Sequence, residues 1–185
     1  KSKIEGKGTR MQSKKASVGE YFGNLISGRS GGLAPPSLEE WLWTFIGCIL
    51  GIGIIMFLAC FIGNPLLAAP LSMSACFIYA DPTGSIAQPR RAFLGNLIAA
   101  IMGLAFYRLL GATWYAESLS LGLVIAAMML TDSMHPPAVA TVSLPFFTEQ
   151  GLLFPLLISI GVIILLIVAF FVNHLARRQY PRFWW

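Results

Sequence analysis

Residues 41–62 read WLWTFIGCILGIGIIMFLACFI. No charged side chain interrupts this run of about 22 residues, which is the length that an α-helix needs to cross the hydrocarbon core of a bilayer. Trp41 and Trp43 stand at its start, where membrane helices carry interfacial aromatic rings. Just upstream, Ser37 and Glu40 have the spacing of a capping box. The sequence therefore predicts a transmembrane helix that begins next to Ser37.

The composition of the whole chain points the same way. Hydrophobic types make up 56% of the 185 residues and charged types only 11%, against roughly 25% charged residues in a soluble domain. So few charges cannot cover a surface exposed to water. This excludes a soluble enzyme, a disordered chain and a disulfide-rich secreted scaffold, and it predicts an integral membrane protein surrounded by the lipid bilayer.

Further apolar runs follow, and they differ in length. Residues 92–110 and 152–172 are long enough to cross a bilayer. Residues 66–80 and 119–130 are shorter, and residues 138–147 contain a proline. We therefore expect an all-α polytopic transmembrane helical bundle of four to five spans, in which some helices are short or broken.

The basic residues indicate how the chain crosses the membrane. The net charge is +5, and the Lys and Arg residues gather before the first span and beside later ones. Because basic residues next to spans are retained on the cytoplasmic side, this pattern reports topology and not nucleic-acid binding. Four crossings, with residues 119–147 as a re-entrant hairpin, would place every basic cluster on one side, so we expect an even number.

Two regions differ in character along the chain. Residues 1–36 are polar and rich in Lys, Ser and Gly. We expect them to form a mobile basic segment, with a short amphipathic turn over residues 18–26. Residues 37–185 are then the transmembrane domain.

The stretch of residues 131–137, TDSMHPP, is the first candidate site. Proline is favoured at the first position of a helix, so Pro136, followed by Pro137, predicts a helix start. The N–H groups and partial positive charge of a helix N-terminus suit an anion. Alternatively, the polar residues cap the helix and the histidine bonds a backbone carbonyl. The candidate anion-binding residues of this stretch are Thr131, Asp132, Ser133 and His135.

The stretch around Pro89 repeats this logic. Pro89 predicts a helix start, with Arg90 and Arg91 in the first turn, where cations oppose the helix dipole. A compensating group is therefore expected. Either the arginines reach the lipid headgroups, or one of them attracts an anion with hydrogen bonds from Gln88. Asn96, inside the next apolar run, could bridge helices.

Two short or broken apolar segments thus end in polar, proline-containing stretches, one in each half of the chain. Such paired interruptions mark binding sites at the membrane midplane of transporters. Ser72, Ser74, Thr131 and Thr141 could line such a path or bond their own helix backbones. His135 could carry a proton with the anion, because its ordinary pKa lies near neutrality.

Other chemistry has little support in the sequence. The chain has no nucleophile elbow, zinc-protease motif or phosphate loop, so we expect no enzyme. Cys48, Cys60 and Cys76 lie in apolar runs without metal-ligand spacing, so we expect no metal and no cofactor. The remaining alternative is a structural or pigment-binding subunit of a larger membrane complex.

Three stretches carry a family resemblance. Residues 131–141 (TDSMHPPAVAT) resemble the signature of the HPP family of integral membrane proteins, residues 87–90 (AQPR) resemble its second motif, and residues 177–185 resemble its C-terminal end. The resemblance covers about residues 35–185. Val139 stands where family sequences often have Gly.

The resemblance implies four transmembrane helices and, from plastid and cyanobacterial members, nitrite transport. It places the chain in a plastid envelope or in a bacterial or cyanobacterial inner membrane. We therefore expect a transporter or channel for a small monovalent anion, with nitrite as the substrate in view of those members, and with proton coupling through His135. A homo-oligomer or a larger complex could enclose the path. The glycine pairs Gly47/Gly51 and Gly95/Gly103 could serve that assembly or internal packing.

Overall fold

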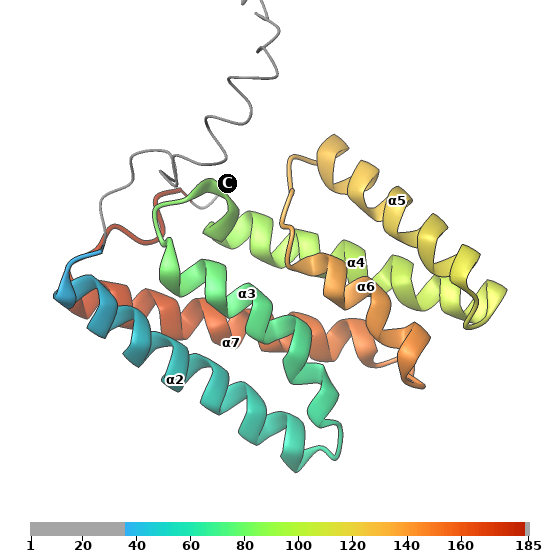
Figure 1. The fold of residues 1–185 in the computed structure, drawn as a ribbon, viewed down its shortest axis with the longest axis horizontal. Helices are drawn as coiled ribbons and strands as arrows, with labels where there is room; N and C mark the ends of the chain where they lie inside the picture. The colour runs from blue at the N-terminus through green and yellow to red at the C-terminus, as the bar shows by residue number, and fades with distance from the viewer. Residues whose placement is uncertain (1–35, 184–185) are drawn as a thin grey trace, which may run out of the picture. The chain divides into compact units, whose positions relative to one another are not determined.

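The computed structural model describes residues 36–183, and Figure 1 shows their arrangement. The mobile segment and the amphipathic turn expected before Pro36 lie outside the described residues. Within the described range the chain is helical. Its helices are α2 (Leu38–Phe61), α3 (Ala68–Ala80), α4 (Pro89–Leu110), α5 (Trp114–Leu130), α6 (Ala138–Phe147) and α7 (Phe154–Leu175), with short 3₁₀ turns η1 (Pro65–Leu67) and η2 (Ser85–Ala87).

Local signals place the ends of the first helix where the sequence predicts them. The Glu40 amide donates to Ser37 Oγ at 3.2 Å, and the Ser37 amide donates to the Glu40 carboxylate at 2.7 Å. This reciprocal capping box starts α2. After Phe61 the chain turns through Gly63, whose φ of +75° favours glycine, and Pro65 opens η1.

The helices fall into two length classes. α2, α4 and α7 have 24, 22 and 22 residues and are long and apolar enough to cross a membrane. α3, α5 and α6 have 13, 17 and 10 residues. At 1.5 Å per residue, α6 is about 15 Å long, half the thickness of a hydrocarbon core. The structure is thus a membrane-type helical bundle with long and short helices, as predicted.

The helices run alternately between two ends of the bundle (Figure 1). At one end, Arg178 after α7 donates to Thr44 Oγ1 of α2 at 3.3 Å, and Tyr180 donates to the Ala87 carbonyl before α4 at 3.2 Å. We call this the arginine end. At the opposite end, Arg108 and Asn64 both bond Gln150, each at 3.0 Å.

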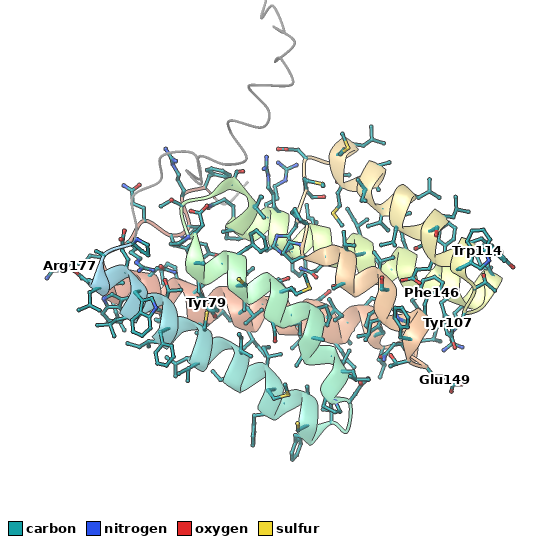
Figure 2. The ribbon with its side chains drawn as sticks, viewed as in Figure 1. Tyr79, Tyr107, Trp114, Phe146, Glu149 and Arg177 are labelled. Atoms are coloured by element: carbon teal, nitrogen blue, oxygen red, sulfur yellow. The ribbon has the colours of Figure 1, made fainter. Side chains whose placement is uncertain are left out.

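The first and last described helices therefore have their outer termini at the same end, and the even number of membrane crossings stays a prediction. Figure 2 places Arg177 at this end, whereas Tyr107 and Phe146 lie at the other end, where their rings meet edge to face with centroids 6.0 Å apart. The arginines of this end are Arg90, Arg91, Arg177, Arg178 and Arg182.

Glycines allow the helices to approach each other closely. A Cβ at Gly51 would lie 2.2 Å from Tyr79 Oη, and one at Gly47 would lie 2.7 Å from the same ring. The groove that the two glycines leave in α2 is therefore filled by Tyr79 of α3, whose hydroxyl donates to the Leu165 carbonyl of α7 at 3.1 Å. The Gly47/Gly51 pair thus serves internal packing.

The second glycine pair brings α4 against α6 and the turn before it. A Cβ at Gly103 would lie 2.6 Å from the Val142 carbonyl oxygen and 2.9 Å from the Val142 Cα. These are backbone atoms of α6, so no side chain can rotate away to make room. α4 also contacts α5 and α7 and is the central helix of the bundle.

Gly103→Ala should therefore destabilise the protein by about 1 to 3 kcal/mol, because the added methyl group must push α4 and α6 apart. Thermal unfolding in detergent measures the loss. The matched control is Gly122→Ala in α5, where a Cβ would meet nothing within 4 Å. Equal melting temperatures for the two variants would show that the α4–α6 contact is not close.

Candidate functional site

The start of α4 and the turn between α5 and α6 meet in a small charge cluster. Arg91 Nη2 lies 2.8 Å from Asp132 Oδ1, and Arg90 Nη1 lies 3.9 Å from Asp132 Oδ2. Arg90 also donates to the Thr131 carbonyl at 3.2 Å. Asp132 is thus the group that compensates the two arginines in the first turn of α4, as expected from the helix dipole. We call the two guanidinium groups that face this carboxylate the arginine pair.

The end of α5 holds Asp132 in place. The Ser133 amide donates to the Met128 carbonyl at 2.9 Å, and Thr131 Oγ1 donates to the Ala127 carbonyl at 2.8 Å. Asp132 itself has a φ of +48°, a left-handed conformation that aspartate tolerates better than most side chains. Its side chain is 69% exposed, so the carboxylate can leave the arginines without unfolding the turn.

His135 lies in the same turn but is buried. Its Nδ1 is 2.9 Å from the Ile86 carbonyl oxygen, and its Nε2 is 3.1 Å from Ser74 Oγ. A carbonyl only accepts, so Nδ1 carries the proton and Nε2 accepts from the Ser74 hydroxyl. Burial lowers the pKa of this imidazole to about 4, which keeps it neutral at pH 7. In this structure His135 is therefore neutral at pH 7, and its role as a proton carrier stays a prediction.

The hydrogen bonds continue from His135 into the bundle. Asn96 Nδ2 of α4 donates to Ser74 Oγ at 3.1 Å and to the Ala92 carbonyl at 2.9 Å. Thr141 Oγ1 of α6 donates to Asn96 Oδ1 at 2.7 Å. His135, Ser74, Asn96 and Thr141 are all fully buried, and we call them the buried polar chain. Asn96 bridges helices, as predicted.

Gly95 makes room for the buried polar chain. A Cβ at that position would lie 2.8 Å from the His135 Cβ and 2.9 Å from the Ser133 carbonyl oxygen. The turn before α6 can therefore lie directly on α4 and bring His135 within reach of Ser74. The Gly95/Gly103 pair, like the pair in α2, serves packing within the chain.

The start of α6 corrects one prediction. The helix begins at Ala138, two residues after Pro136, so the predicted start is wrong. Pro136 and Pro137 have no amide proton, and the next three amides donate to the carbonyls of His135, Pro136 and Pro137 at 2.9, 3.1 and 3.2 Å. These short-range bonds leave no amide of residues 136–140 for an anion.

Gln88 connects two separate backbone segments at the arginine end. Its Nε2 donates to the Pro82 and Gly84 carbonyls at 3.1 and 2.8 Å, and its Oε1 accepts from the Arg182 amide at 2.9 Å. The expected hydrogen bonds from Gln88 to an anion are therefore replaced by bonds to backbone. Pro89 is the first residue of α4, as predicted.

Sequence reasoning missed two buried tyrosines. Tyr79 of α3, labelled in Figure 2, packs against α2 and donates to α7, and Tyr180 connects the residues after α7 to the start of α4. Burial raises the pKa of Tyr180. The signal for Tyr79 was indirect, because the glycines at positions 47 and 51 predict only that some neighbour packs closely on this face of α2. Within residues 36–183, no three His, Cys, Asp or Glu side chains gather as a metal site.

These features define a polytopic α-helical membrane protein with a buried polar chain next to an arginine pair. The family described as "HPP, transmembrane region" matches residues 33–181. The chain belongs to this family.

Two relatives in Dictyostelium discoideum, both described as transmembrane proteins, are similar to it. One is 32% identical over 81% of this chain and 58% of its own length. The other is 29% identical over 91% of this chain and 60% of its own length. The chain thus spans about three fifths of the curated relatives that it matches. No solved structure matches it.

Thr141→Val should destabilise the protein by about 1 to 3 kcal/mol, because it leaves the buried Asn96 Oδ1 without its donor at nearly unchanged volume. Thermal unfolding again measures the change. Thr113→Val is the matched control, since the buried Thr113 Oγ1 has no hydrogen-bond partner among the described residues. If both substitutions have the same effect, the hydrogen bond to Asn96 contributes nothing.

Burial of neutral His135 also predicts a pH dependence. A folded-state pKa of about 4, below the ordinary value of 6.5, means that stability is complete above pH 6.5 and falls as the pH drops toward 4. Melting temperatures between pH 4 and 8 should show this slope in the wild type. His135→Gln should flatten the slope, and His174→Gln, at an exposed histidine, should retain it. An unchanged slope in His135→Gln would assign the acid sensitivity to other groups.

Proposed function

We propose that this protein is a transporter or channel that passes a small monovalent anion, with nitrite as its substrate. The observation that carries the proposal is the arginine pair. Arg91 and Arg90 face the two oxygens of one carboxylate, at 2.8 and 3.9 Å. A carboxylate group and nitrite are both bent, with two oxygens on one central atom and a charge of −1, so a site that holds one can hold the other.

The buried polar chain supports a substrate path that leads from the arginine pair into the bundle. Polar side chains within a membrane domain are costly and mark ion or substrate pathways by default. Ser74 and Thr141 carry hydroxyls that can rotate, and Asn96 carries an amide, so the chain offers donors to an anion once its internal bonds open. In the present conformation these groups bond one another, His135 and the Ala92 carbonyl, and the proposal takes this conformation as the closed state.

Asp132 would act as the internal competitor of the substrate. Its exposed carboxylate occupies Arg91 while the site is empty, and the arriving anion would take its place. The released carboxylate then frees the turn of residues 131–137, which also carries His135. An anion next to His135 would raise its pKa, because opposite charge favours the protonated form. Proton uptake would thus accompany anion entry.

The alternative of a pigment-binding subunit has less support. Both ring nitrogens of His135 have hydrogen-bond partners, so an axial ligand there would require the turn to rearrange. His174 is exposed and stacks on Phe170. Assembly into a homo-oligomer or larger complex, and location in a plastid envelope or bacterial inner membrane, stay predictions.

Nitrite uptake into proteoliposomes, with and without an inward proton gradient, tests the proposal. Arg91→Gln should lower the apparent affinity for nitrite by about tenfold to a hundredfold, since a hydrogen bond to a charged group contributes about 1.5 to 3 kcal/mol. Asp132→Asn should raise the apparent affinity, because the internal competitor is lost. Formate, which has the same shape and charge, should compete with nitrite better than chloride does.

Arg108→Gln, at the end of α4 away from the arginine pair, is the matched control and should keep wild-type affinity. Absence of nitrite and formate uptake by the wild type would refute the proposal. Uptake that survives Arg91→Gln unchanged would remove the arginine pair from the pathway.

A further inference from the structure

The hydroxyl of Ser74 is the point at which two branches of the buried polar chain meet. Its Oγ lies 3.1 Å from His135 Nε2, in the turn before α6, and 3.1 Å from Asn96 Nδ2 of α4. Ser74 is fully buried, so the hydroxyl meets these partners away from bulk water. Its one proton and two lone pairs must therefore serve both neighbours.

Two backbone carbonyls fix the direction of these hydrogen bonds. The Ile86 carbonyl, 2.9 Å from His135 Nδ1, can only accept, so Nδ1 carries the ring proton. The Ala92 carbonyl, 2.9 Å from Asn96 Nδ2, likewise requires the amide nitrogen on its side. With both neighbours fixed in this way, the Ser74 hydroxyl accepts from Asn96 and donates its own proton to Nε2. This arrangement matches a neutral imidazole.

A proton on Nε2 would reverse one of these bonds. Nε2 would then be a donor, and two donors cannot share one hydrogen bond. The Ser74 Oγ can accept from Nε2 and from Asn96 together if its own proton turns to the Pro70 carbonyl, one turn earlier on α3. Serine hydroxyls make this bond within helices, and Ser72 makes it to the Ala68 carbonyl at 2.8 Å. Ser74 keeps its proton throughout, and the proton on Nε2 comes from water.

Ionisable groups on the surrounding segments bond neither ring nitrogen of His135. Burial lowers the pKa of this ring, and the bond to the Ile86 carbonyl opposes the change. Asp132 of the same turn faces Arg91 and Arg90 instead. η2 and α6 carry no ionisable side chain. The other ionisable residues of α3, α4, α5 and the stretch between α3 and α4 are Cys76, Tyr79, Asp81, Tyr107, Arg108, Tyr115 and Glu117. Ser74 is therefore the side chain that meets the ring at Nε2.

We propose that Ser74 is a positioning residue for proton uptake, which donates to neutral His135 and accepts from charged His135. The ring then keeps both of its hydrogen bonds in either state, and a charge at this buried place has an acceptor for each N–H. This inference rests on the proposed function, in which proton uptake accompanies anion entry. Ser74 acts in it only through His135.

NMR of the full chain in detergent, with isotope-labelled histidine, tests the role of Ser74 at the ring itself. His174→Gln is present throughout, so that the signal belongs to His135. With Ser74 in place, the neutral ring should carry its proton on Nδ1. Ser74→Ala should lower the proton affinity of the ring about fivefold to tenfold, because the bond lost to the charged ring is roughly twice as strong as the bond lost to the neutral ring.

Ser120→Ala is the matched control. Ser120 is as buried as Ser74, and its Oγ has no hydrogen-bond partner among the described residues, so this variant should keep the original proton affinity. Ser74→Thr retains the hydroxyl and should restore the affinity that Ser74→Ala loses. The position of the ring proton is measured without any change at Ser74, so the proposal stays testable if Ser74→Ala fails to fold.

Two results at the ring would overturn the proposal. One is a neutral ring that carries its proton on Nε2, and the other is an equal proton affinity in Ser74→Ala and Ser120→Ala. In proteoliposomes, Ser74→Ala should move the pH profile of nitrite uptake to lower pH by the same factor, and an unmoved profile would remove Ser74 from proton uptake. If no nitrite is taken up while the ring titrates as expected, the proposed transport fails and the role of Ser74 toward His135 holds.

Discussion

The cost of burying polar groups governs this bundle. His135, Ser74, Asn96 and Thr141 are fully removed from solvent, and an unpaired polar group in such surroundings costs several kcal/mol. Each of them meets its partner on another segment, so α3, α4, α6 and the turn before α6 must keep one mutual register. Hydrogen bonds therefore fix the register of these helices. Apolar packing alone would fix it poorly, because apolar side chains gain little from leaving lipid for each other.

Small residues make that register reachable. Gly95 and Gly103 lie two turns apart on α4 and let the backbone before and within α6 approach to contact distance. Gly47 and Gly51 do the same on α2, where the Tyr79 ring fills the space and its hydroxyl reaches α7. Close approach and polar pairing thus depend on each other, since a larger residue at Gly95 would move His135 away from Ser74.

Charge is separated from this interior. The described arginines other than Arg108 gather at one end, and there Asp132 joins the α5–α6 turn to the first turn of α4. The ion pair is exposed and contributes little to stability by itself. It is therefore suited to exchange its carboxylate for another anion, while the buried bonds behind it maintain the fold.

The sequence by itself determined the features that depend on neighbouring residues. Long apolar runs predicted α2, α4 and α7, the Ser37–Glu40 spacing predicted the start of α2, and Pro89 predicted the start of α4. The need for a partner to Arg90 and Arg91, and the bridging role of Asn96, also followed from local chemistry.

Only the tertiary structure decided which distant groups meet. Ser74 and His135 are 61 positions apart, and Gln88 bonds backbone 94 positions away. The helix begins at Ala138 and not at Pro136, and the amides of residues 138–140 donate to the carbonyls three residues before them. Helical periodicity places a side chain on a face. The partner on the other side of that face depends on how the helices pack, which no local pattern encodes.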